Sequence, residues 1–145
     1  MDNETKLITV SIVTPNGVQY EHHGQIVVLD AIDGELGIMA GHEPIVTPLN
    51  IGSVQVKRIH SHDEQTDEIA VNGGYVEFSN DVATIIADSA ERARDIDINR
   101  AESAKERAVR HIEEAKKKHD VSSQKRAEVA LRRAINRINV YSSKK

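Results

Sequence analysis

The sequence changes character near residue 90, and this change constrains the fold more than any other feature. All 8 glycines and all 3 prolines lie at or before residue 74. Residues 1–90 hold 3 basic and 14 acidic residues, a net charge of −11, whereas residues 91–145 hold 16 and 9, a net charge of +7. A change in turn-forming residues that coincides with a change in charge marks two structural units. We therefore expect two domains, 1–90 and 91–145.

The composition also excludes several classes of protein. The chain has no cysteine, so no disulfide stabilises it. It holds no run of 18 apolar residues that would span a membrane, and MDNETKLITV at its start has no apolar signal core. We expect a protein that works in the cytosol or docks on a membrane complex from the cytosolic side.

The first unit has the alternation of β-strands. In ITVSIV, Ile8, Val10 and Ile12 face one way and the polar residues between them the other, which is the period of a half-buried strand. Similar runs follow at 25–31, 53–59, 67–73, 75–79 and 82–88. Short strands with turn signals between them predict an antiparallel sandwich or barrel. Because three glycines punctuate it, the stretch GELGIMAGHEPIVTPL (34–49) is interpreted as a tight loop or β-bulge, and a binding role for this stretch is the alternative.

The second unit has the composition of two helices. Between Asp95 and Lys118 there is no glycine or proline, and Ala, Glu, Lys and Arg dominate. HDVSS (119–123) interrupts this pattern, and Ser122 or Ser123 is expected to cap a second helix that ends near Asn139. The short polar connection predicts an antiparallel hairpin. The fold class is thus α+β, with an N-terminal antiparallel β-sandwich or barrel and a C-terminal two-helix hairpin.

Small residues dominate the seam between the helices. The expected contact positions are Ala101, Ala104, Ala108, Ile112 and Ala115 on the first helix, and Ala127, Leu131, Ala134, Ile135 and Ile138 on the second. A buried alanine contributes only part of the roughly 1.5–3 kcal/mol that a buried leucine or isoleucine brings. We therefore expect a hairpin that is marginally stable by itself and able to open.

Four arginines are predicted to line one flank of the hairpin. At about 100° per residue, Arg100 and Arg107 lie roughly 90° to one side of the first apolar stripe. Arg137 and Arg133 lie roughly 95° and 135° from the second stripe, in the direction that places them on the same flank of an antiparallel pair. Guanidinium groups match phosphate oxygens well, so the spacing is compatible with a polyphosphate site.

A solvated, charged face is the alternative interpretation of these arginines. Glu102, Glu106 and Glu128 are placed to pair with them along the helices, each pair contributing a few tenths of a kcal/mol. Likewise, Asp95 or Asp97 in DIDINRA (95–101) is by itself best explained as a helix cap. Periodicity alone leaves both alternatives open.

The sequence argues against two other classes of function. A nucleic-acid-binding hairpin would use KKK (116–118) and the arginines, but the helical part has one aromatic residue, Tyr141, and no base-reading motif. A metal site would need His22 and His23, or His60 and His62; such pairs are more often polar surface, so no metal is expected. No nucleophile with its base can be assembled, which argues against an enzyme.

Several segments together resemble the epsilon subunit of bacterial rotary ATP synthases. They are GELGIMAGHEPIVTPL, then VNGGYVEF, then AERARDIDINRAESAKERA, and a final helix that ends in LRRAINRINV. The resemblance implies a sandwich, not a barrel, and a non-catalytic subunit of the central stalk of a proton- or sodium-translocating enzyme. It implies a peripheral location at the cytoplasmic side of the bacterial cell membrane, held there by the complex.

The resemblance also implies partners. The sandwich would bind the gamma subunit and the membrane-embedded c-ring, and so couple rotation to ATP synthesis. Glu35 matches the acidic residue that faces the c-ring, and His42 and Thr47 match positions on the side that faces gamma. In the extended state, the basic hairpin would reach acidic segments of the catalytic beta subunits and inhibit ATP hydrolysis.

Some members of that family bind ATP on the folded hairpin, as a regulatory ligand and not as a required cofactor. Their motif matches Ile96-Asp97-Ile98-Asn99-Arg100-Ala101 here. The resemblance implies that Ile96, Asp97 and Ala101 hold adenine and that arginines hold the phosphates. The residues implied in the site are Glu91, Ile96, Asp97, Arg100, Ala101, Arg107, Arg133 and Arg137.

Overall fold

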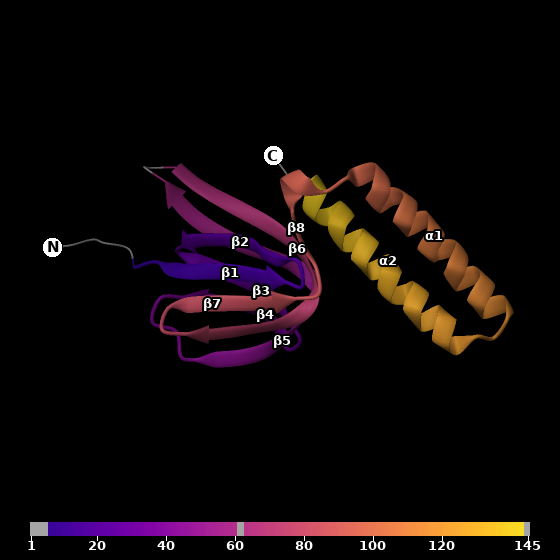
Figure 1. Cartoon of the computed structure of the whole chain (residues 1–145), viewed down its shortest axis with the longest axis horizontal. Helices are drawn as coiled ribbons and strands as arrows, with labels where there is room; N and C mark the ends of the chain where they lie inside the picture. Colours follow the sequence, from indigo (N-terminus) through magenta and orange to yellow (C-terminus); the bar gives the residue numbers. More distant parts are fainter. Residues whose placement is uncertain (1–5, 61–62, 144–145) are drawn as a thin grey trace. The chain divides into compact units, whose positions relative to one another are not determined.

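A computed structural model describes residues 6–60 and 63–143, and of His60 the backbone only. The chain forms two compact units, which divide between Arg92 and Ala93 (Figure 1). The expected division between residues 90 and 91 lies two residues earlier, because the last strand of the first unit extends through Arg92. The two units are described separately below.

The first unit is built from eight strands in the described part of the chain. Seven of them pair in the order β2-β1-β7-β6-β5-β3-β4, and the eighth, β8, pairs with β6 as an additional neighbour. β2 also contacts β5, although three strands lie between them in this order, so the sheet folds over itself into a sandwich. The strands are β1 (Ile8–Thr14), β2 (Gly17–Gly24), β3 (Ile26–Ala31), β4 (Gly34–Met39), β5 (Ile45–His60), β6 (Asp63–Ser79), β7 (Val82–Ala87) and β8 (Ala90–Arg92).

Most of the pairing is antiparallel, as expected, with one difference. β1 runs parallel to β7, and Ile12 pairs with Ile85. Both of these side chains are completely buried and belong to one continuous apolar core, together with Phe78 and Val56. Alternation along β1 places Ile8, Val10 and Ile12 in this core, which confirms the sequence prediction.

Three details of the strand prediction were wrong. The stretch 34–49, expected to be a loop, holds β4 and the beginning of β5. The runs 67–73 and 75–79 form the single strand β6, in which Gly74 has a φ of +123° and keeps the pairing with Ala87. β2, whose buried positions are few, was missed.

The second unit is a pair of helices in contact along their lengths. A short 3-10 helix, η1 (Ala93–Asp95), precedes α1 (Ile98–Lys117), and α2 (Val121–Ser142) follows after a short turn. Asp120, and not a serine, caps α2: its carboxylate accepts a 3.1 Å hydrogen bond from the Ser123 N–H and a 2.7 Å bond from the Ser123 hydroxyl. These bonds, the one from the backbone foremost, lower the pKa of Asp120 below its ordinary value.

Most of the buried residues of the two helices are alanines. Ala101, Ala108 and Ala115 of α1 are spaced by seven residues, and Ala127 and Ala134 of α2 continue this pattern. Small side chains allow two helices to approach closely but bury little apolar area. Ile135, expected in the seam, is 36% exposed, and Val140, which was not expected there, is buried. No helix in the described ranges is long and apolar enough to cross a membrane.

Candidate functional site

The start of α1 is built by the residues of DIDINRA. Asp97 is the N-cap, and its Oδ1 accepts a 3.1 Å hydrogen bond from the backbone N–H of Arg100. This bond satisfies a donor that the first turn of a helix leaves free. Ile96 and Ala101 are buried, whereas Asp97 and Arg100 are exposed. The motif thus has an apolar side and a polar side at one helix end.

Three of the four predicted arginines have no carboxylate partner among the described residues. Arg100, Arg107 and Arg133 are exposed, and no described residue forms an ion pair with any of them within 4.0 Å. The ion pairs that Glu102, Glu106 and Glu128 could form with these arginines are thus absent among the described residues, and solvent reaches all three guanidiniums. Glu128, one of its candidates, accepts a 3.0 Å hydrogen bond from Gln124 instead. Basic side chains without an ion pair on a small domain favour binding of an anion.

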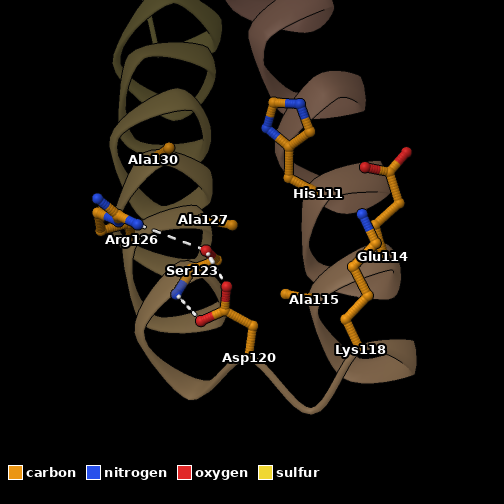
Figure 2. Close-up of a pocket in the computed structure, with 9 residues that line it drawn as sticks. All are labelled: His111, Glu114, Ala115, Lys118, Asp120, Ser123, Arg126, Ala127 and Ala130. Carbon is orange, nitrogen blue, oxygen red and sulfur yellow. Dashed lines mark hydrogen bonds between the residues drawn. The ribbon is translucent and has the colours of Figure 1, made fainter.

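A hollow between α1 and α2 shows which residues share one flank of the hairpin. It measures about 400 Å³ and lies beside the connecting turn, with Ala115 and Ala127 facing the gap (Figure 2). Its rim carries charges of both signs, so the hollow itself is not an obvious anion site. It is lined by His111, Glu114, Ala115, Lys118, Asp120, Ser123, Arg126, Ala127 and Ala130.

The arginines lie on the same flank as this hollow, farther from the turn. Seven residues turn an α-helix through about 700°, so positions seven apart lie on nearly the same side. Arg107 and Arg100 precede Glu114 of the rim by seven and fourteen residues. Arg133 follows Arg126 of the rim by seven. The helical repeat thus supports the predicted arrangement of these three guanidiniums along one edge.

Arg137 and Glu91 differ from the other candidates. Arg137 follows Ala130 of the rim by seven residues, but it is half-buried and engaged in an interaction of its own. Glu91 lies on β8, paired with Ala70, and so belongs to the sheet domain and not to the helical one. The remaining candidates all lie in the helical domain.

The residues predicted to contact partners lie on the sandwich. Glu35 on β4 is exposed and stands opposite Asp30 of β3, at a hollow of about 260 Å³ that Ser53 and Gln55 also line. His42 packs edge-on against Phe78, with ring centroids 5.8 Å apart. Thr47 is half-buried and pairs with Val76, which is fully buried.

The structure also contains a polar cluster that the sequence analysis missed. Asp67 on β6 is 7% exposed and accepts a 2.6 Å hydrogen bond from the Tyr20 hydroxyl. Its Oδ2 lies 2.8 Å from Nε of Arg58, and its Oδ1 lies 3.8 Å from Nη2 of Arg92. Gln65 donates a further hydrogen bond of 3.0 Å. Pairing between distant strands brings these residues together, so sequence spacing gave no signal.

The cluster shifts the pKa of both its acidic members. Burial alone would raise the pKa of Asp67, but the Tyr20 hydrogen bond and the Arg58 guanidinium outweigh it and lower the pKa below its ordinary value. Burial, followed by the hydrogen bond to Asp67, raises the pKa of Tyr20 well above 10. Asp67 is therefore ionised and Tyr20 neutral near neutral pH.

No metal-binding group of three or more His, Asp or Glu side chains occurs in the described part of the chain. The Nδ1 of His23 lies 3.1 Å from the Thr9 hydroxyl, and His22 Nδ1 lies 3.4 Å from Nη1 of Arg58. His62, the other candidate ligand, lies outside the described residues, as does the side chain of His60.

Comparison with known proteins agrees with this architecture. Residues 7–93 match the family model of the ATP synthase delta/epsilon chain beta-sandwich domain, and residues 94–142 match that of the delta/epsilon chain long alpha-helix domain. A sandwich followed by such a helical part defines the delta/epsilon class of ATP synthase chains. The chain belongs to this family as an epsilon chain, a subunit of the central stalk of the F-type ATP synthase.

Individual relatives are similar over most of their lengths. The ATP synthase epsilon chain of Lactobacillus helveticus is 59% identical over 144 residues, which cover 99% of each chain. That of Lactobacillus gasseri is 58% identical over 140 residues, covering 97% of this chain and 96% of the relative. A chain in the mitochondrial ATP synthase of Euglena gracilis shares the fold, with a TM-score of 0.72 at 21% identity, over 91% of this chain and 80% of that one.

Proposed function

We propose that the helical domain is a regulatory hairpin that binds ATP when folded and inhibits ATP hydrolysis when extended. The observation that carries this proposal is that Arg100, Arg107 and Arg133 share a flank and form no ion pair with any described carboxylate. The mutual repulsion of these cations falls when a polyphosphate lies between them. ATP binding to the folded form alone would then shift the population toward it.

The base of the nucleotide would lie at the start of α1. Ile96 and Ala101 supply buried apolar surface there, and Asp97 supplies carboxylate oxygens that accept hydrogen bonds from an amino group such as that of adenine. Arg107, Arg133 and Arg137 lie farther along the flank, on the side of the phosphates. ATP acts here as a regulatory ligand, and the subunit requires no cofactor.

The sandwich would attach the subunit to the rotor. In this proposal the side with His42 and Thr47 faces the gamma subunit, and Glu35 faces the c-ring, whose ion is a proton or a sodium ion. The subunit then transmits rotation to the head of the enzyme and is peripheral to the bacterial membrane, on its cytoplasmic side. Copurification with gamma tests this attachment, and Glu35→Lys should weaken binding to the c-ring while leaving binding to gamma unchanged.

Inhibition would use the positive charge of the extended hairpin against acidic segments of the catalytic beta subunits. Lys116, Lys117 and Lys118 at the end of α1 are all exposed and available for such contacts. ATP hydrolysis by the catalytic complex, measured with added wild-type or variant chain, tests this step. Replacement of the three lysines by glutamate should relieve inhibition, whereas replacement by arginine should keep it. Equal inhibition by both variants would contradict the proposal.

A further inference from the structure

The cluster around Asp67 joins four strands of the sandwich. Asp67 receives contacts from side chains of three other strands: Tyr20 of β2, Arg58 of β5 and Arg92 of β8. Arg92 is the last residue of the sheet domain, and the helical domain begins at the next residue. The proposed nucleotide site and rotor contacts make no use of this cluster.

Arg92 is held in two ways. Its Nη2 lies 3.8 Å from Oδ1 of Asp67, and its guanidinium carbon lies 5.2 Å from the centroid of the Tyr20 ring. The Tyr20 hydroxyl in turn donates to Asp67, so the three side chains contact one another. The Arg92 side chain is 18% exposed and that of Asp67 is 6% exposed, which means that water screens their attraction only weakly.

β8 needs such support because it is very short. It has three residues, which pair with Ile69, Ala70 and Val71 of β6, and no further strand lies beyond it in the described sheet. At the other end of β8, the preceding residue Ser89 accepts two hydrogen bonds from Asn72. The backbone N–H of Asn72 donates to the Ser89 carbonyl at 3.0 Å, and the Asn72 side chain donates to the Ser89 hydroxyl at 2.6 Å. β8 is therefore fastened by side chains at both ends.

We propose that the Asp67 cluster is a latch that keeps β8 paired with β6 and so fixes Arg92 as the last immobile residue before the hairpin. This inference rests on the proposed function, because a latch at this point matters only if the hairpin moves. If β8 separated from β6, three more residues would join the moving segment and lengthen its connection by about 10 Å. The latch thus sets how far the hairpin reaches.

Amide hydrogen exchange of the full chain tests the latch without ATP or partner subunits. Arg92→Gln removes the charge of a side chain that is 18% exposed and does not belong to the apolar core. Arg94→Gln is the matched control: the Arg94 side chain is 65% exposed, and its one ion pair among the described residues, with Asp95, is long at 4.0 Å. Arg92→Gln should speed the exchange of the β8 amides at least about tenfold, whereas Arg94→Gln should leave it within about twofold. Unchanged exchange in Arg92→Gln would overturn the proposal.

Two further readouts separate a released strand from general unfolding and from failure of the proposed function. The amides of Val27 and Ile38, paired in β3 and β4, should keep their wild-type exchange rates in Arg92→Gln. Faster exchange at these amides as well would mean that the cluster supports the whole sandwich and not β8 in particular.

In the assembled complex, Arg92→Gln should change the degree of inhibition and Arg94→Gln should not. A wild-type chain that fails to inhibit ATP hydrolysis would refute the proposed function. The latch would then be judged by the exchange of the β8 amides alone, because that measurement does not depend on inhibition.

Discussion

Tyr20 on β2 donates a 2.6 Å hydrogen bond to Asp67 on β6, 47 residues farther along the chain. Tyr20 is 3% exposed and Asp67 is 7% exposed, so this bond joins a neutral and an ionised group inside the sandwich. Hydrogen bonds to buried charges contribute more than those between neutral groups, at roughly 1.5–3 kcal/mol. The stability of the sheet domain should therefore depend on the protonation of Tyr20.

Tyr20→Phe tests this dependence on pH. The pKa of Tyr20 is raised in the folded protein, so its contribution is complete below the unfolded value of about 10 and is lost as pH rises toward the folded value. At pH 8 the variant should be less stable than wild type by about 1.5–3 kcal/mol. Above pH 10 the difference should shrink by up to about 1.4 kcal/mol per pH unit. Urea unfolding followed by amide resonances of β1 and β7 measures it; a difference independent of pH would contradict the assignment.

Asp97→Ala should loosen the first turn of α1. The substitution removes the acceptor of the Arg100 N–H and should cost about 1 kcal/mol, which corresponds to roughly fivefold faster exchange of that amide. Asp95→Ala is the matched control, because Asp95 lies in η1 and does not cap α1. Equal effects of the two substitutions on the Arg100 amide would show that Asp97 is not the cap.

Ala134→Leu should open the helical hairpin. Ala134 is completely buried, and added side-chain atoms in a close helix contact typically cost about 1–3 kcal/mol. Ala130→Leu, one turn away at an exposed position beside the hollow, should have little effect. Hydrogen exchange across residues 100–138 would report the opening. If both variants kept wild-type exchange, the seam would not be the close contact described above.

Gly74→Ala and Gly34→Ala separate steric overlap from backbone strain. The two glycines have nearly the same φ, +123° and +124°. A Cβ atom on Gly74 would overlap the carbonyl oxygen of Ile86, whereas one on Gly34 would meet no atom within 4 Å. Gly34→Ala should therefore cost only the strain of its φ, about 1–2 kcal/mol, and Gly74→Ala distinctly more. Equal loss of unfolding free energy in the two variants would contradict this.

Local patterns predicted the helices well and some strands less well. The absence of glycine and proline located α1 and α2, but the cap of α2 was placed at a serine because Asp120 stands in a stretch that also holds Ser122 and Ser123. The glycines of 34–49 suggested a loop, yet Gly37 lies inside β4, where a Cβ would meet only the end of the Ile26 side chain at 3.4 Å.

Tertiary contacts explain what the sequence did not predict. The helical repeat placed Arg100, Arg107 and Arg133 on one flank, because periodicity is a local property of a helix. The Asp67 cluster depends instead on the pairing of β5, β6 and β8, and no spacing between its members in the sequence reveals that pairing. Sequence patterns therefore indicated the proposed ligand site but not the proposed latch.

Isothermal titration of the full chain with ATP tests the proposed nucleotide site most directly. Wild type should bind one ATP, and Arg100→Ala and Arg133→Ala should each bind it at least about tenfold more weakly. Arg100→Ala keeps the helix start intact, because Asp97 caps a backbone N–H. Arg132→Ala, an exposed neighbour about 100° around α2 from Arg133, should bind within about twofold of wild type. The same affinity in all four proteins would contradict the nucleotide site.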